Sequence, residues 1–172
     1  ARAADRGGQP LRRERHAQVG DSPGIIGWVC GHPVASDVIR NLLAGGLRPI
    51  KRTVRQLLAR APQASVLDVG CGSGMMSQLV TGRYLGIDTD RRFLDYAARR
   101  YGVEGRLQFA SQSATRLPYA DASFDQSLVI NVMHHLADAP LQQTLAELGR
   151  VTRHQVIIVD MAPLRYNLLG ML

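Results

Sequence analysis

The sequence has few cysteines and no long apolar stretch. Cys30 and Cys71 are the only cysteines among its 172 residues, too few for the disulfide framework of a small secreted domain. Cys30 and His32 alone do not make a zinc signature, so no metal site is expected. No run of 18 or more apolar residues occurs, and the first residues contain no apolar stretch of signal-peptide length. We therefore expect a reduced, cytoplasmic protein without a membrane-spanning helix.

Lysine is almost absent, and yet the chain is basic. Its formal net charge is +7, from 21 Lys and Arg against 14 Asp and Glu, and Lys51 is the only lysine. Residues 1–60 hold 11 of these basic residues and 4 of the acidic ones, so the whole excess lies there. A basic arm is typical of proteins that bind nucleic acid or an anionic membrane. No aromatic residues interleave the arginines to stack on bases, so we favour a solvated arginine-rich segment and keep nucleic acid as an alternative.

The length fits one domain with a core of its own. Residues 1–33 are expected to form a mobile basic leader, which includes a short apolar cover segment at 24–30 with the only tryptophan. Residues 34–172 are expected to form the folded domain. It should begin with two helices, one after Ser36 and one from Pro49.

The most informative stretch is residues 65–74, which read Ser-Val-Leu-Asp-Val-Gly-Cys-Gly-Ser-Gly. Its apolar run predicts a strand buried on both faces, and its glycines predict a tight turn into a helix. Because Gly70, Gly72 and Gly74 carry no Cβ, a ligand could lie against the main chain and meet the N–H groups at the helix start. Met75 stands where a dinucleotide fingerprint needs its third glycine. The turn is therefore predicted to bind a cofactor that is not a dinucleotide.

Four further strands alternate with helices along the chain, and they are predicted over residues 84–88, 106–111, 126–131 and 155–160. This alternation predicts an α/β fold, a Rossmann-like three-layer sandwich with a mostly parallel sheet. Asp88 ends the second strand, where an acid can accept hydrogen bonds from ribose hydroxyls. It could instead cap the next helix, but Thr89 or Asp90 can fill that role.

Two helices are predicted on the apolar side chains that they would bury. The helix after Asp90 should bury Phe93, Leu94, Ala97, Ala98 and Tyr101. The helix capped by Asp138 should place Leu141, Leu145 and Leu148 on one face.

Several of these segments resemble the class I S-adenosylmethionine-dependent methyltransferases. The glycine-rich stretch resembles their motif I, and residues 86–90 resemble their motif II. Residues 115–125 resemble the family's LPF-D-SFD run, and residues 131–138 are similar to the VLHHL-D segment of small-molecule methyltransferases such as those of ubiquinone and menaquinone biosynthesis. The matches follow the family's order over residues 65–160. The resemblance implies that residues 34–172 form a methyltransferase domain that binds S-adenosyl-L-methionine and releases S-adenosyl-L-homocysteine.

The resemblance also implies which positions bind the cofactor. They are Asp68, Gly70, Cys71, Gly72, Gly74, Asp88, Thr89, Ser113, Ala114 and Asn131. Relatives carry Gly-Asp-Ala after the third strand, and their acid accepts the adenine amino group. This chain has Gln112-Ser113-Ala114 there. Since a serine lacks the charge that strengthens the contact, we expect adenine recognition to be weaker or to use main-chain groups and packing.

Two histidines lie next to the predicted site. By resemblance, His134 is the candidate general base or acceptor-orienting group, and His135 is expected to secure the loop. The alternative that both only make hydrogen bonds within the loop stays open.

The acceptor class follows partly from what is missing after the fourth strand. Asn131 is followed by Val132 and Met133, so the Asn/Asp-Pro-Pro-aromatic run of enzymes that methylate nucleobase amines is absent. No cysteine stands there for cytosine C5 chemistry. We therefore expect methyl transfer to an oxygen or carbon of a small or lipid-like molecule. The alternatives are an RNA methyltransferase that uses the basic arm and a non-catalytic partner subunit.

The family normally adds a helix and two more strands after the fifth strand, but only residues 161–172 follow here, enough for one short helix around Leu164, Leu168 and Leu169. We expect a chain that lacks its C-terminal strands, or a sheet edge closed by a second copy in a homo-oligomer.

Overall fold

The computed structural model describes residues 32, 33, 35 and 48–160. The expected leader with its cover segment, the helix after Ser36 and the C-terminal helix lie outside these residues, apart from isolated positions.

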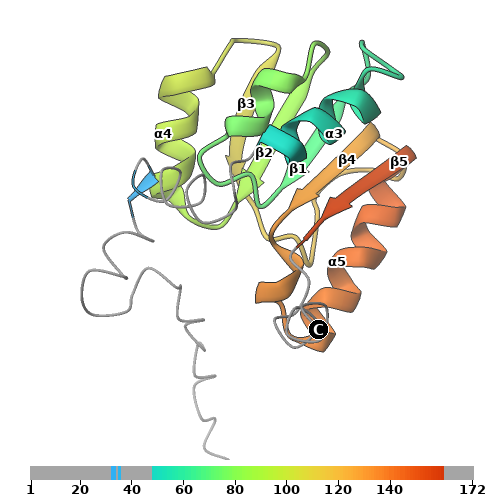
Figure 1. Cartoon of the computed structure of the whole chain (residues 1–172). Coiled ribbons are helices and arrows are strands. Elements are labelled where there is room, and N and C mark those ends of the chain that lie inside the picture. The colour runs from blue at the N-terminus through green and yellow to red at the C-terminus, as the bar shows by residue number, and fades with distance from the viewer. Residues whose placement is uncertain (1–31, 34, 36–47, 161–172) are drawn as a thin grey trace, which may run out of the picture.

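A parallel sheet of five strands forms the centre of the described chain (Figure 1). Its strands are β1 (Val66–Val69), β2 (Tyr84–Asp88), β3 (Leu107–Ser111), β4 (Phe124–Ile130) and β5 (Thr152–Val159). They lie in the order β3-β2-β1-β4-β5, and every neighbouring pair is parallel. The predicted α/β fold class, Rossmann-like with a parallel sheet, is confirmed.

Helices pack on the sheet. They are α3 (Arg48–Leu58), α4 (Arg91–Tyr101), α5 (Asp138–Val151) and two 3-10 helices, η2 (Met75–Leu79) and η3 (Met133–His135). Leu58 of α3 and Met76 of η2 belong to one core cluster, and Leu148 of α5 belongs to a second. None of the described helices is both long and apolar enough to cross a bilayer.

The central strand β1 shows why the sheet forms here. All four of its residues are buried, as expected for a parallel strand covered on both faces. Its register pairs Val69 with Ile87 of β2 and with Val129 of β4. Because these strands are parallel, the glycine turn after β1, Asp88 of β2 and the loop after β4 emerge at the same edge of the sheet.

Three details of the predicted elements are wrong. The segment after the glycine turn is a five-residue 3-10 helix, because only nine residues separate Gly74 from Tyr84 and too little chain remains for a longer helix. Asp138 lies in the first turn of α5, and the N-cap position belongs to Ala137, which makes no side-chain cap. Strands β4 and β5 begin earlier than predicted because Phe124 pairs with Thr152 across an irregularity in register.

Two predicted core positions are also wrong. Ala98 is exposed on α4, and Leu145 on α5 is 44% exposed. The apolar stripes that the sequence shows are therefore wider than the faces that the sheet covers.

Candidate functional site

Three left-handed glycines shape the turn after β1. Gly70, Gly72 and Gly74 have φ angles of 70°, 51° and 75°. Residues with a Cβ rarely adopt this conformation, so the backbone of the turn favours glycine at all three positions. The main-chain N–H groups of Gly70 and Cys71 both donate to the carbonyl of Ile87, at 2.8 and 3.0 Å. The turn is thereby tied to the end of β2.

The missing Cβ atoms of two of these glycines face the protein. A Cβ at Gly70 would lie 2.4 Å from Val132 Cγ2, and one at Gly74 would lie 2.7 Å from Phe109 Cε1. A Cβ at Gly72 would meet only Phe93 Cδ1, at 3.9 Å. Close packing therefore explains why a Cβ is excluded at Gly70 and Gly74, and of the three glycines Gly72 alone has space beside it.

Asp88 turns toward the glycine turn. Its Oδ2 accepts a hydrogen bond from the Gly72 N–H at 2.9 Å, and its Oδ1 accepts one from the Asp90 N–H at 3.0 Å. Asp90, and not Asp88, caps α4 by accepting from the Arg92 N–H. Each oxygen of a carboxylate has room for about one more hydrogen bond. Asp88 can therefore organise the turn and still accept hydrogen bonds from a ligand.

Asp68 lies beneath the turn and is buried. The Tyr84 hydroxyl donates to its Oδ2 at 2.6 Å. Burial raises the pKa of Asp68 to about 7, although the Tyr84 hydrogen bond lowers it, and the charge of Asp88 raises it further. Burial also raises the pKa of the neighbouring Cys71 thiol, together with the charges of Asp68 and Asp88. A raised pKa favours the protonated thiol, which is a poorer nucleophile than the thiolate.

The segment after β3 runs beside Asp88. The Gln112 N–H donates to the Asp88 carbonyl at 3.1 Å. The Ser113 hydroxyl lies 2.9 Å from Thr115 Oγ1 and accepts from the Thr115 N–H at 3.3 Å. Ser113 and Thr89 are exposed, and Ala114 is half-buried. These sequence-predicted positions lie at the carboxyl ends of β2 and β3, the same edge as the glycine turn.

Arg150 holds the loop between β3 and β4, and the sequence analysis did not identify this arginine. Its guanidinium donates to the carbonyls of Leu117 and Tyr119, to Asp121 and to both oxygens of Glu147. Glu147 also accepts from the Leu117 N–H at 2.6 Å. The hydrogen bonds from Arg150 and then from Leu117 lower the pKa of Glu147 to about 2. The Glu-Arg spacing of three residues on a helix was the one available signal.

The loop after β4 completes the edge. Asn131 has a φ of 56°, and its N–H donates to the Val159 carbonyl at 2.8 Å. Val132 packs over Gly70. The rings of His134 and His135 lie 3.9 Å apart between centroids. The Val132 contact brings the glycine turn and the histidine segment together.

His134 has a carboxylate partner that the sequence analysis did not identify. Its ring Nδ1 lies 2.5 Å from Asp160 Oδ1, and its main-chain N–H donates to Asp160 Oδ2 at 3.2 Å. Asp160 comes directly after β5. Apolar residues precede it in the sequence, and nothing there indicates that it faces His134.

Comparison with known proteins decides the family. A model described as a methyltransferase domain matches residues 67–159, which is more than half of the chain. The chain belongs to this family. The family and the shared fold support S-adenosyl-L-methionine as the cofactor of this methyltransferase domain.

Individual relatives agree with the assignment. The chain is 31% identical over 121 residues to O-methyltransferase cnsE of Penicillium expansum, covering 65% of this chain and 43% of that protein. It is 34% identical over 113 residues to methyltransferase GfsG of Streptomyces halstedii, covering 60% of this chain and 40% of that protein. The crystal structure of the PH0226 protein from Pyrococcus horikoshii matches with a TM-score of 0.62 at 25% identity, covering 72% of this chain and 62% of that chain. The methyltransferase domain thus spans less than half the length of these two curated relatives.

The residues at the carboxyl edge fit the ribose end of the cofactor. Asp88 keeps acceptor capacity beside Gly72, the glycine with space next to it. The fit to adenine is poorer, because the neutral Ser113 hydroxyl already bonds to Thr115.

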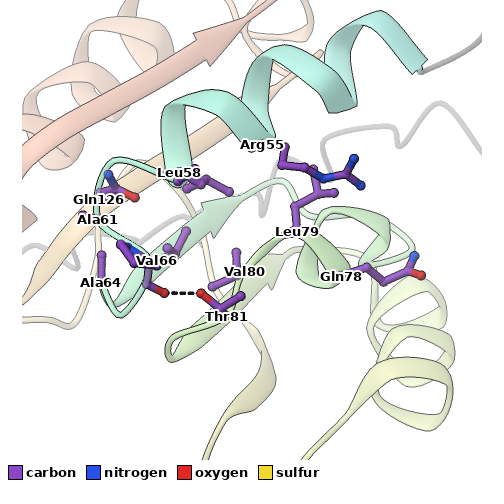
Figure 2. Close-up of a pocket in the computed structure, with 12 residues that line it drawn as sticks. Arg55, Leu58, Ala61, Ala64, Val66, Gln78, Leu79, Val80, Thr81 and Gln126 are labelled. Carbon is purple, nitrogen blue, oxygen red and sulfur yellow. Dashed lines mark hydrogen bonds between the residues drawn. The ribbon is translucent and has the colours of Figure 1, made fainter.

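A cavity of about 270 Å³ lies elsewhere (Figure 2). It lies between α3 and the start of β1, with Arg55, Val66 and Gln126 in its lining. Val66 and Gln126 stand near the amino ends of their strands, whereas Asp88 is the last residue of β2 and His134 lies in the loop after β4. The cavity is therefore separate from the candidate site.

Proposed function

We propose that this domain carries out S-adenosylmethionine-dependent methyl transfer to an oxygen of a small or lipid-like molecule. The observation that carries the proposal is the Asp88 carboxylate, which points at the glycine turn and holds Gly72. The O-methyltransferase name of the relative from Penicillium expansum supports oxygen over carbon as the accepting atom.

The cofactor would lie along the carboxyl edge of β1, β2 and β4. Asp88 would accept hydrogen bonds from the ribose hydroxyls, and the main chain from Gly70 to Gly74 would contact the rest of the cofactor, with Thr89 beside the ribose. Ser113 and Ala114 would lie next to adenine, and Asn131 next to the methionine part. Asp68 lies buried below the turn with a pKa of about 7, and the positively charged groups of the cofactor would favour its ionised form.

When bound, S-adenosylmethionine supplies an activated methyl group on a positively charged sulfur. The protein therefore has mainly to align the acceptor with that group and to exclude water. Alignment of this kind can supply roughly 7–11 kcal/mol of a reaction barrier. A base is needed where the acceptor keeps its proton at the reacting pH, and His134 is the proposed base.

Residues 34–172 are proposed to form this domain, with residues 1–33 as its leader. The acceptor is proposed to be a small or lipid-like molecule and not a nucleic acid.

The experiment combines binding with turnover. S-Adenosylmethionine is titrated calorimetrically into the full chain, and S-adenosylhomocysteine formation is then measured with a set of phenols, catechols and long-chain hydroxy acids, and with a mixed RNA. We expect cofactor binding and product formation with a hydroxylated small molecule, reduced about 100-fold or more in His134→Gln.

Asp138→Asn is the matched control, because Asp138 is exposed in the first turn of α5 and should leave turnover unchanged. Absence of cofactor binding would contradict the proposal. Methylation of RNA alone would show that the acceptor is RNA and not a small or lipid-like molecule.

A further inference from the structure

We propose that Asp160 is a positioning residue for His134: it keeps the imidazole proton on Nδ1 and thereby presents an unprotonated Nε2 to a hydroxyl group of the acceptor. This inference rests on the proposed methyl transfer and adds a residue and an acceptor chemistry to it.

The Asp160 carboxylate contacts His134 at two points, the ring and the main chain. Oδ1 of Asp160 lies 2.5 Å from the ring Nδ1 of His134, and Oδ2 accepts from the main-chain N–H of the same residue at 3.2 Å. Two contacts from one rigid carboxylate fix both the position of the main chain and the rotation of the ring. The side chains of His134 and Asp160 are 29% and 18% exposed, so the pair is partly shielded from water.

The fold brings the two residues together. His134 belongs to η3, which follows β4, and Asp160 follows β5. Strands β4 and β5 are parallel neighbours, so their carboxyl ends meet at one edge. The hydrogen bond from the Asn131 N–H to the Val159 carbonyl ties the two strand ends together at 2.8 Å, three residues before His134 and one before Asp160.

The hydrogen-bonding capacity of the Asp160 carboxylate determines the tautomer of His134. An ionised carboxylate can only accept hydrogen bonds, so the Nδ1 atom that faces it must carry the proton. A neutral imidazole with its proton on Nδ1 has its lone pair on Nε2. A carboxylate behind the ring also stabilises the imidazolium that forms when Nε2 takes a proton.

This arrangement suits an acceptor that loses a proton as it is methylated. As the acceptor oxygen forms its bond to the methyl carbon, the bond from that carbon to sulfur breaks and its electron pair stays on sulfur. The hydroxyl proton moves to Nε2 of His134. The acceptor class is therefore a neutral hydroxyl compound, such as a phenol or an alcohol.

Substitution of Asp160 by asparagine should reverse the tautomer. The main-chain N–H of His134 can only donate, so the amide oxygen of the new side chain should face it. The amide NH₂ group then faces Nδ1, which must accept. The ring proton moves to Nε2, and the lone pair that the acceptor needs is lost.

The test reads the tautomer directly. The full chain is labelled with ¹⁵N-histidine, and the ring nitrogens are observed by long-range ¹H–¹⁵N correlation NMR, with His134→Gln used to assign the signal. We expect the Nδ1–H pattern for His134 in the parent and the Nε2–H pattern in Asp160→Asn. Asp138→Asn removes the same charge in the first turn of α5 and should keep the parent pattern.

An Nε2–H pattern for His134 in the parent would overturn the proposal, and so would an unchanged pattern in a folded Asp160→Asn. The parent spectrum alone decides the matter if that variant does not fold. Neither spectrum requires an acceptor, so a failure of methyl transfer itself is seen separately in the assay for S-adenosylhomocysteine. With an acceptor that is turned over, Asp160→Asn should lower kcat about 100-fold or more and leave KM for S-adenosylmethionine within about twofold.

Discussion

Two glycines of the same turn should differ sharply in their tolerance of alanine. Gly70 and Gly72 both have positive φ, at 70° and 51°. An added Cβ at Gly70 would lie 2.4 Å from Val132 Cγ2, whereas one at Gly72 would find its nearest neighbour at 3.9 Å. The pair therefore separates the cost of left-handed backbone from the cost of a steric clash.

The magnitudes follow from these two terms. Left-handed backbone costs a residue with a Cβ about 1–2 kcal/mol, and both variants should lose this amount. Forcing one extra carbon into a packed site costs about 1–3 kcal/mol more, and only Gly70→Ala should lose it. We expect Gly72→Ala to lower the free energy of unfolding by about 1–2 kcal/mol and Gly70→Ala by about 2–5 kcal/mol.

Urea unfolding followed by circular dichroism measures both values. Val132→Ala tests the cause, because it removes both methyl groups that the new Cβ would crowd. In a double-mutant cycle, Gly70→Ala combined with Val132→Ala should recover about 1–3 kcal/mol relative to the sum of the single changes. Equal losses for the two glycine variants, or strict additivity with Val132→Ala, would refute the packing that the structure shows.

Two further predictions concern the buried acid and the arginine that holds the loop. The pKa of Asp68 is about 7 in the folded protein and 3.8 without the fold, so the folded state binds the extra proton and stability should fall as pH rises from about 4 to 7. Asp68→Asn should remove this pH dependence, which amounts to up to about 4 kcal/mol in the free energy of unfolding between the two ends of the window. Urea unfolding at several pH values measures it, and the same pH dependence in the parent and in Asp68→Asn would count against the buried carboxyl. Arg150→Lys should expose the main-chain N–H groups of residues 117 and 119–122 to faster hydrogen exchange, because a single ammonium cannot reach the two carbonyls, Asp121 and Glu147 together. Arg99→Lys, at an exposed position of α4, is its control, and equal exchange in the two variants would show that the Arg150 guanidinium is not what holds the loop.

The sheet could be predicted because its signals are local. Apolar residues on both sides of Asp68 mark β1, and Asp88 was placed correctly at the end of β2. Its role in capping was also resolved correctly, since Asp90 provides the cap of α4. These features depend on residues close together in the chain.

Features that depend on distant contacts were missed. Asp160 meets His134 only because β4 and β5 are neighbours, and Arg150 reaches a loop about thirty residues earlier in the chain. The sequence likewise did not show why a side chain is excluded at Gly70, since this depends on Val132 from the loop after β4. A periodic pattern in the sequence does not contain such contacts.

The central claim is that Asp88 and the glycine turn together seat the adenosine part of the cofactor. Calorimetric titration of S-adenosylhomocysteine into the full chain and into Asp88→Ala tests it most directly. Hydrogen bonds to a charged group are worth about 1.5–3 kcal/mol each, so loss of one or two should weaken binding at least about 10-fold. Asp95→Asn, on an exposed position of α4, should bind like the parent. Equal affinities for the parent and a folded Asp88→Ala would contradict the account.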